Sequence, residues 1–483
     1  MTNEQLVRKV WNFAHVLRDD GVSSADYVEQ ITYLLFLKMD QERVNDLGED
    51  SDIPLKYRWE NLMNKDGQAL QEQYRKILEA LGNKRGLIGK IFHRAENKLS
   101  TPARLKRVVS LIDSETWIGL DVDVKGEIYE GLLERNASEV KSGAGQYFTP
   151  RPVIEAIVKC INPKITDMVC DPACGTGGFL LAAYNHMKTK SGDKRKSKKL
   201  KEAFTGIDIV SEVVRLCAMN LYLHGIGNGG SPVEQGDALQ NAGGAHYDVV
   251  ITNPPFGTKS GHKIIGEDGR VSVERESYER EDFMFTTSNK QFNFLQHIMT
   301  ILKTNGRAGV VMPDNVLFEG KGAGKGIRKR LLESFNFHTL LRLPTGIWYS
   351  QGVKANVLFF DKRPPAAKGH QTKELWVYDY RTNIDKTLKE KRLTREDMQD
   401  FINCYQSKPR KETERFKRFT YEQIVQRDNL NLNVSWLKDD SLEDVDNLPE
   451  PDVLSAEIVE NLETALEQFR GVNQELLNKE VTE

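Results

Sequence analysis

The stretch YDVVITNPPFG, residues 247–257, decides how the rest of the chain is interpreted. Its first six residues, Tyr247–Thr252, are mostly apolar and predict a buried strand, which then enters a stiff turn. Two consecutive prolines fix φ twice and remove two backbone donors, and a residue before proline is pushed out of the helical region. The turn therefore presents the Asn253 side chain, the backbone carbonyls and the Phe256 ring in a predetermined shape. Such a turn suits an exocyclic amine that donates hydrogen bonds while its ring stacks alongside, as in enzymes that act on an extruded nucleobase.

A glycine-rich turn lies upstream in DPACGTGGF, residues 171–179. It follows the apolar run Met168–Cys170 and precedes a helix-like segment that begins at Leu180, so the pattern predicts strand, turn and helix. Glycines let the backbone approach a ligand, and the first N–H groups of a helix bind anionic groups. The spacing is neither G-x-G-x-x-G nor that of a phosphate-binding P-loop, which favours a nucleoside ligand other than a dinucleotide or a nucleoside triphosphate.

These two motifs, in this order, resemble those of the amino-group DNA methyltransferases that use S-adenosylmethionine. The segment QYFTPR, residues 146–151, and the N-terminal segment around 17–38 are similar to the modification (M) subunits of type I restriction–modification systems. The resemblance covers most of residues 1–380. It implies an α/β fold with a mostly parallel seven-stranded sheet and helices on both faces, together with an N-terminal helical domain and a C-terminal helical tail. The implied activity is transfer of a methyl group from S-adenosylmethionine to N6 of a flipped adenine.

The resemblance and the residue chemistry together assign roles to the predicted strand ends. Asp171 and the turn are expected to hold the methionine end of the cofactor, Asp208 its ribose hydroxyls, and Asp237 its adenine amine. Asn253 and the Pro254 carbonyl would accept from the target amine, and Phe256 would stack on the extruded base. The expected catalytic residues are Asn253, Pro254, Pro255 and Phe256, and the expected cofactor-binding residues are Gln146, Tyr147, Phe148, Thr149, Pro150, Arg151, Asp171, Gly175, Thr176, Gly177, Gly178, Asp208 and Asp237.

Alternatives to adenine methylation stay open at this point. The same amine chemistry suits N4 of cytosine, related turns modify protein or RNA, and an inactive assembly scaffold is a further reading. Ring-carbon methylation is disfavoured because it needs a cysteine after a proline, and none of the five cysteines follows one.

Composition sets broad limits on the chain. It has 483 residues, 39% hydrophobic and 29% charged, with a net charge of −2. No apolar run approaches the ~20 residues of a membrane helix, and the N-terminus lacks a secretion signal, so the cytoplasm is the expected compartment. The cysteines form no C-x-x-C pair, so neither a metal site nor a disulfide framework is expected.

Three domains are predicted: an N-terminal helical domain over 1–140, a catalytic domain over 141–385, and a C-terminal helical tail for subunit assembly over 386–483. In the middle part, apolar runs alternate with helical segments, which implies a largely parallel sheet covered on both faces. After about residue 385 the sheet pattern stops. The apolar spacing after Pro451 predicts a final helix that contacts either its own domain or a partner helix.

Three polar segments have open interpretations. Residues 258–281 are read as either a surface insertion or a lid over the base. The basic cluster within 188–201 is favoured as a solvated loop over a phosphate contact. The glycine-rich segment 319–326 is read as a flexible loop at a DNA-facing rim, with a helix following from Ile327.

The chain shows no compact base-reading module, so sequence-specific action on DNA implies a separate reader. The resemblance likewise implies a specificity (S) subunit, a second copy of the chain in a complex of two M subunits with one S subunit, and a restriction (R) subunit for cleavage.

Overall fold

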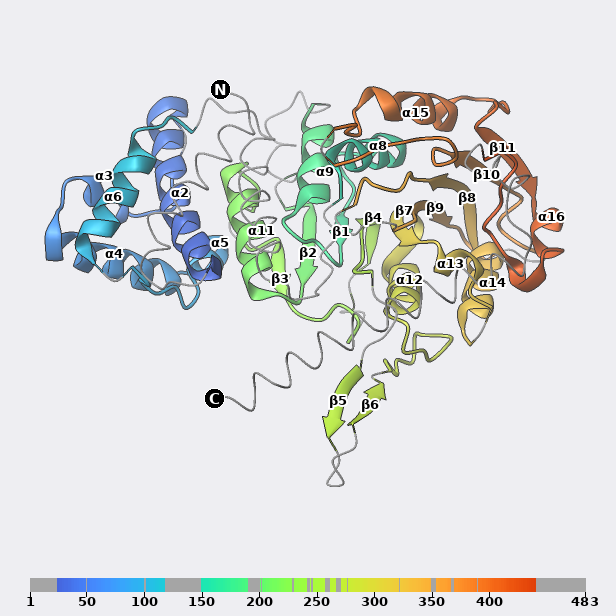
Figure 1. The fold of residues 1–483 in the computed structure, drawn as a ribbon, viewed down its shortest axis with the longest axis horizontal. Helices are drawn as coiled ribbons and strands as arrows, with labels where there is room; N and C mark the ends of the chain where they lie inside the picture. Colours follow the sequence, from blue (N-terminus) through green and yellow to red (C-terminus); the bar gives the residue numbers. More distant parts are fainter. Residues whose placement is uncertain are drawn as a thin grey trace, which may run out of the picture. The chain divides into compact units, whose positions relative to one another are not determined.

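A mixed sheet forms the centre of the catalytic region in the computed structural model (Figure 1). Within the described residues it has nine strands in the order β11-β10-β8-β9-β7-β4-β1-β2-β3. The structure describes residues 24–48, 50–99, 101–117, 149–189, 200, 202–227, 230–240, 244, 246–256, 261–265, 271–275, 277–320, 322–348, 353–365, 369–388 and 390–439. The sheet strands are β1 (Val169–Asp171), β2 (Phe204–Asp208), β3 (Val233–Gln235), β4 (Tyr247–Thr252), β7 (Leu302–Pro313), β8 (Phe335–Arg342), β9 (Ala355–Lys362), β10 (Glu374–Asp379) and β11 (Phe416–Thr420).

The expected seven-stranded arrangement is present and is extended by two strands. Strands β3, β2, β1, β4 and β7 are parallel neighbours, whereas β9 is antiparallel to both β7 and β8. Strand β10 adds to β8 in parallel, and β11 pairs antiparallel with β10 through residues 416–420. The expectation that the sheet pattern stops after residue 385 was therefore wrong for β11. Its short FKRFT sequence carries too little apolar periodicity to stand out, and its partner lies far away in sequence.

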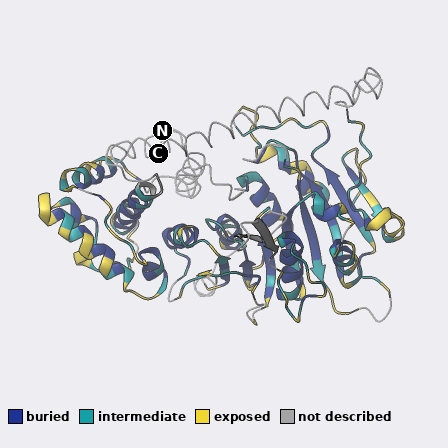
Figure 2. Cartoon of the chain, turned by 60° about the horizontal axis from the view of Figure 1, so that its bottom comes forward, coloured by how far each residue is buried: buried dark blue, intermediate teal, exposed yellow. Residues whose placement is uncertain are grey.

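Helices cover the sheet on two sides. Helices α8 and α9 contact each other on one side, and α12 and α14 contact each other on the other side (Figure 1). Burial follows the same layering, because the strands are buried and the outer helices show exposed faces (Figure 2). The helices of this region are α8 (Arg151–Ile161), α9 (Gly178–Lys188), α11 (Ser211–Leu223), α12 (Lys290–Ile301), α13 (Asn315–Phe318), α14 (Gly324–Ser334), α15 (Gln399–Gln406) and α16 (Tyr421–Val425), with 3-10 turns η2 (Glu396–Met398) and η3 (Asp428–Leu430).

The described part of the N-terminal region is helical, as predicted. Ile31, Leu34, Leu35 and Met39 recur at helical spacing along α2 and are fully buried, and Trp59 and Trp117 are buried as well. The elements are α2 (Ser24–Leu47), η1 (Leu55–Tyr57), α3 (Glu60–Met63), α4 (Gly67–Gly82), α5 (Gly86–Ile91) and α6 (Pro102–Asp113). None of the helices in the described ranges is long and apolar enough to cross a membrane.

Buried polar contacts join these helices to α11 of the catalytic region. The Arg43 guanidinium lies 4.6 Å from the centre of the Tyr222 ring and is paired with Asp40 at 3.1 Å. The Tyr222 hydroxyl donates to the same carboxylate at 3.1 Å, and burial raises the pKa of Tyr222 to about 12. An ion pair between Arg215 and Glu29 links the two regions a second time.

Residues 386–435 pack on the catalytic region. Arg395 makes a two-pronged contact with Glu155 of α8, with N–O distances of 2.8 and 2.7 Å. The Gln406 amide donates to the Lys159 carbonyl at 3.1 Å, also on α8. The predicted final helix after Pro451 lies outside the described residues.

Candidate active site

Four parallel strands bring the predicted site residues to one edge of the sheet. Asp171 ends β1, Asp208 ends β2, Asp237 follows β3 and Asn253 follows β4. These strands are neighbours in the order β3-β2-β1-β4, and adjacent strands lie about 4.8 Å apart. Their carboxyl ends form one row, which is where open α/β sheets bind ligands.

Hydrogen bonds hold the glycine-rich turn against this row. The Gly175 N–H donates to the Asp208 carboxylate at 3.1 Å, and the Cys174 N–H donates to the Ile207 carbonyl at 3.0 Å. The Asn220 side chain of α11 donates to the Thr176 carbonyl at 3.0 Å. The turn is thus fixed to β2 and α11 before any ligand arrives.

The glycines of the turn serve different purposes. Gly175 has φ +52°, and a Cβ added there would meet nothing within 4 Å. Gly177 has φ +87°, and its added Cβ would lie 2.9 Å from the Cys217 Sγ. A left-handed φ favours glycine at both positions, while the open space at Gly175 leaves its backbone accessible to a ligand.

Asp171 is a buried carboxyl whose pKa is raised above its ordinary value. Its side chain is at most 1% exposed, and the Ala173 N–H donates to it at 3.1 Å. Burial raises the pKa of Asp171 to about 7, and the nearby Asp208 charge adds to the increase, whereas the Thr252 hydroxyl and the Ala173 N–H oppose it. A cationic ligand group beside this carboxyl would favour its ionised form.

Asp208 and Asp237 are only partly buried, so a ligand can reach them. One Asp208 oxygen accepts from Gly175 and the other accepts from the Val210 N–H at 3.0 Å. Burial raises the pKa of Asp208 as well. Asp237 accepts from the Leu239 N–H at 2.9 Å and from the Tyr278 hydroxyl at 2.8 Å. Each carboxylate oxygen has a further lone pair for a ligand hydroxyl or amine.

The polar groups along the row fit a nucleoside that carries an amino-acid arm. It combines a buried carboxyl and an open glycine backbone at one end with two reachable carboxylates along the row. Tyr278, which sequence reasoning missed, belongs to the polar segment after β4, where no sequence pattern marked it as a contact of Asp237.

The NPPF turn follows β4 at the same edge. Asn253 and Phe256 are half-buried, Pro254 is buried and Pro255 is exposed. The Phe256 ring meets the Trp348 ring edge to face, with centroids 5.7 Å apart and planes at 63°. Trp348 was also missed, because nothing in its local sequence connects it with the turn.

The predicted segment 146–151 is described only from Thr149 onward. The Asn253 Nδ2 donates to the Thr149 Oγ1 at 2.8 Å, which links this segment directly to the NPPF turn. Pro150 is the N-cap of α8, and Arg151 is the first residue of the helix. Gln146, Tyr147 and Phe148 lie outside the described residues.

The polar segments have mixed outcomes. Residues 261–265 and 271–275 form an antiparallel hairpin, β5 (Gly261–Ile265) and β6 (Val271–Arg275), within the expected insertion. Helix α14 begins at Gly324, earlier than predicted, so part of the segment 319–326 is helical. Most of the basic cluster within 188–201 lies outside the described residues.

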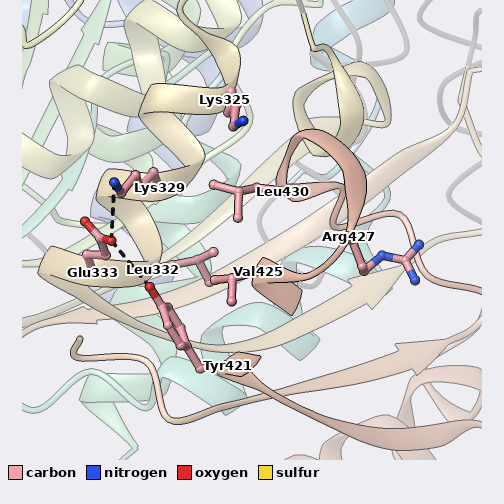
Figure 3. A pocket seen from close by; sticks show the side chains of 8 residues that line it. All are labelled: Lys325, Lys329, Leu332, Glu333, Tyr421, Val425, Arg427 and Leu430. Atoms are coloured by element: carbon pink, nitrogen blue, oxygen red, sulfur yellow. Dashed lines mark hydrogen bonds and ion pairs between the residues drawn. The ribbon is translucent and has the colours of Figure 1, made fainter. Parts of the chain in front are cut away.

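A separate pocket of about 320 Å³ lies between α14 and the α16–η3 segment (Figure 3). Two of its three cations are already engaged, because Lys329 is 3.8 Å from Glu333 and Arg427 donates to the Asn431 and Asn433 carbonyls. None of its lining residues belongs to the strand-end row. They are Lys325, Lys329, Leu332, Glu333, Tyr421, Val425, Arg427 and Leu430.

Comparisons with known proteins show the family of the chain. The profile of the N-6 DNA methylase family matches residues 120–444, and that of the HsdM N-terminal domain matches residues 6–112. The chain is 39% identical to the type I restriction enzyme EcoKI methylase subunit of Escherichia coli K12, over 99% of this chain and 96% of that protein. It is 38% identical to the StySPI methylase subunit of Salmonella potsdam, with the same coverage.

Solved structures show a similar arrangement. A crystal structure of the EcoKI M protein (EC 2.1.1.72) is 34% identical and gives a TM-score of 0.55, over 98% of this chain and 96% of that one. A structure from a study of complex assembly and conformational transition in a type I restriction–modification system is 26% identical. It gives a TM-score of 0.68 over 99% of both chains.

Proposed function

Because the chain belongs to the N-6 DNA methylase family and is an adenine-N6 DNA methyltransferase that uses S-adenosylmethionine, we propose that the row of strand ends is its active site. In this proposal the cofactor lies along β1, β2 and β3, and the target adenine is flipped out of the duplex onto the NPPF turn. The observation that carries it is the convergence of Asp171, Asp208, Asp237 and Asn253 at four neighbouring strand ends.

The cofactor side of the site binds by complementary charge and shape. Asp171 and the backbone of Gly175–Gly178 hold the amino-acid arm. Gly175 leaves open space beside its backbone. The ammonium of the arm would stabilise the ionised form of the Asp171 carboxyl, whose pKa is raised by burial. Asp208 accepts the ribose hydroxyls, and Asp237 accepts the adenine amine. The segment Gln146–Arg151 closes over the cofactor. When bound, S-adenosylmethionine supplies an electrophilic methyl group on a sulfonium.

The NPPF turn prepares the nucleophile. The target amine delocalises its lone pair into the ring, which makes it a poor nucleophile. Acceptance of its two N–H bonds by the Asn253 Oδ1 and the Pro254 carbonyl favours a tetrahedral nitrogen whose lone pair faces the methyl group. Pro255 keeps the turn stiff, and Phe256 stacks on the flipped base, an interaction worth about 1–3 kcal/mol per base. The amine nitrogen would bond to the methyl carbon as the sulfur–methyl bond breaks, the neutral thioether S-adenosylhomocysteine would leave, and the methylated nitrogen would then lose one proton to solvent.

The proposed partners follow from the relatives. The curated relatives are methylase subunits of type I restriction enzymes, which supports work with a specificity subunit, a second copy of the chain and a restriction subunit, in the cytoplasm. The three-part division at residues 140 and 385 is part of the same proposal. The 386–483 part then serves subunit assembly, apart from β11, which extends the catalytic sheet.

The test is methyl transfer by the full chain with its specificity partner, using labelled S-adenosylmethionine and unmethylated DNA. We expect label in N6-methyladenine only when the partner is present. Asn253→Ala should lower kcat at least about 100-fold while it leaves cofactor affinity unchanged. Asn403→Ala, at an exposed position on α15, is the matched control and should behave as the wild type. Label in cytosine, RNA or protein, or an unaffected Asn253→Ala variant, would reject the proposal.

A further inference from the structure

Thr149 touches the proposed catalytic asparagine. The Asn253 Nδ2 donates to the Thr149 Oγ1 at 2.8 Å, and Thr149 is only 6% exposed. The two residues are 104 positions apart in sequence. This hydrogen bond joins the buried Thr149 of the proposed cofactor segment to the half-buried Asn253 of the proposed substrate turn.

Both ends of this hydrogen bond are held by rigid neighbours. Thr149 precedes Pro150, which caps α8 with φ −54°. Helix α8 is fixed to the sheet by Ile157, whose Cγ2 is so close to β7 that a Cβ on Gly309 would lie 2.8 Å from it. Asn253 follows β4, and the proline after it restricts its backbone.

The amide plane of an asparagine is otherwise weakly fixed. Its last side-chain torsion joins an sp³ to an sp² carbon and has a broad energy profile. When Thr149 accepts from the nitrogen, the amide plane is set, and the oxygen on the other side of the same carbon points away from Thr149. An amine donor requires the oxygen rather than the NH2 group of Asn253 to face it.

We propose that Thr149 is a positioning residue, which holds the Asn253 carboxamide so that its oxygen meets the target amine. This inference rests on the proposed function, and it gives the Thr149 side chain a task other than binding the cofactor. Misplacement of a reacting group by about 1 Å costs roughly 100-fold in rate, so loss of the hydrogen bond should lower turnover rather than cofactor binding.

The experiment compares Thr149→Val, which keeps the side-chain shape without a hydroxyl, with Thr149→Ser, which keeps the hydroxyl. Both are assayed as full chains in the complex with the specificity partner. For Thr149→Val we expect kcat to fall about 10- to 100-fold. The KM for S-adenosylmethionine and the Kd for S-adenosylhomocysteine by calorimetry should stay within about twofold, and Tm should be close to that of the wild type. Thr149→Ser should restore most of the turnover.

Each other outcome overturns the inference. Wild-type kcat in Thr149→Val shows that the hydrogen bond does not position Asn253. A cofactor Kd that rises with kcat unchanged assigns the hydroxyl to cofactor binding instead. Equal losses in the Val and Ser variants assign the effect to shape. Asn253→Ala in the same assay distinguishes failure of the proposed function from failure of the role of Thr149. If Asn253→Ala stays active, the proposed function is rejected. If Asn253→Ala is inactive and Thr149→Val has normal turnover, only the positioning role of Thr149 is rejected.

Discussion

Two glycine-rich segments of this chain lie at the starts of helices, yet their glycines serve opposite purposes. In the turn before α9, Gly175 has a left-handed φ of +52° and open space where a side chain would lie. In the segment 319–326, whose last residues form the first turn of α14, a Cβ on Gly324 would lie 2.7 Å from the Glu319 carbonyl, and one on Gly326 would lie 2.2 Å from the Phe285 ring. Glycine in the first segment leaves room for a ligand, and glycine in the second lets the chain pack onto itself.

The charges around the two segments also differ. The first is lined by the carboxyls of Asp171 and Asp208, both with raised pKa values. The second is held by Arg328, which is fully buried and donates to the carbonyls of Val316, Glu319, Asn429 and Leu430 at 2.8–3.1 Å. Glycine content therefore cannot by itself identify a binding loop; the space beside each glycine and the charge facing it distinguish the two.

The largest expected effect is a loss of folding stability when the second glycine-rich segment is altered. Arg328→Ala leaves four carbonyls without this donor in a buried place, so the free energy of unfolding should fall by about 3–5 kcal/mol. Urea denaturation of the full chain measures the change. Lys329→Ala, whose exposed ammonium is 3.8 Å from Glu333, is the control and should cost less than about 0.5 kcal/mol. Equal small losses in both variants would mean that the guanidinium does not hold the segment.

A smaller loss of stability is expected for Gly326→Ala. The added Cβ would overlap the Phe285 ring, and overpacking of this kind costs about 1–3 kcal/mol. Gly230→Ala, where nothing lies within 4 Å, is the matched control and should change the denaturation midpoint little. A midpoint for Gly326→Ala equal to that of the control would show that the ring moves aside without cost.

A substitution in the first glycine-rich segment should change the affinity for the ligand more than the stability of the fold. Gly175→Ala introduces about 1 kcal/mol of backbone strain, because φ there is left-handed. Its methyl group enters the space proposed for the cofactor, so the Kd for S-adenosylhomocysteine should rise about tenfold, or roughly 1.4 kcal/mol. Calorimetry and a thermal melt on the same sample separate the two effects. Unchanged affinity would remove Gly175 from the cofactor site.

The smallest effect is a pH dependence from Asp171. Its pKa of about 7 in the folded chain is above the usual value, so the stability from the protonated, buried form is complete below about pH 4 and is lost as pH rises toward 7. Binding of an ammonium-bearing ligand favours the ionised carboxyl. Affinity for S-adenosylhomocysteine should therefore rise about threefold between pH 6.5 and 7.5 and then level off. Asp171→Asn should flatten this profile, and a wild type with no slope would contradict the assignment.

The sequence predicted the parts of the fold whose signals are local. The boundaries of β4 were predicted correctly at Tyr247 and Thr252, because an apolar run meets two prolines there. The apolar run that ends at Cys170 predicted the end of β1 to within one residue of the observed end at Asp171, since an acidic residue and a proline follow the run. The row of site residues followed from these strand ends and from the parallel order of the strands.

What the sequence did not predict depends on contacts between distant segments. Strand β11 is defined by its pairing with β10, and no local pattern of apolar residues predicts that pairing. The contacts of Tyr278 with Asp237, Trp348 with Phe256 and Thr149 with Asn253 each join segments tens of residues apart. The close packing of the segment 319–326 depends on Arg328 and Phe285, whose positions only the tertiary structure fixes.

The outermost strand β3 is contacted at its first residue by helix α5 of the N-terminal region, whereas Glu234 and Gln235 are exposed. The Lys90 ammonium of α5 donates to the Val233 carbonyl at 2.5 Å, and Leu87 of the same helix lies against Gly227, shortly before the strand. An uncovered edge strand offers its backbone to strands of other molecules and promotes aggregation. Helix α5 thus occupies one backbone acceptor at this edge of the sheet, and we expect a truncated chain that lacks the helical region to aggregate more readily during expression.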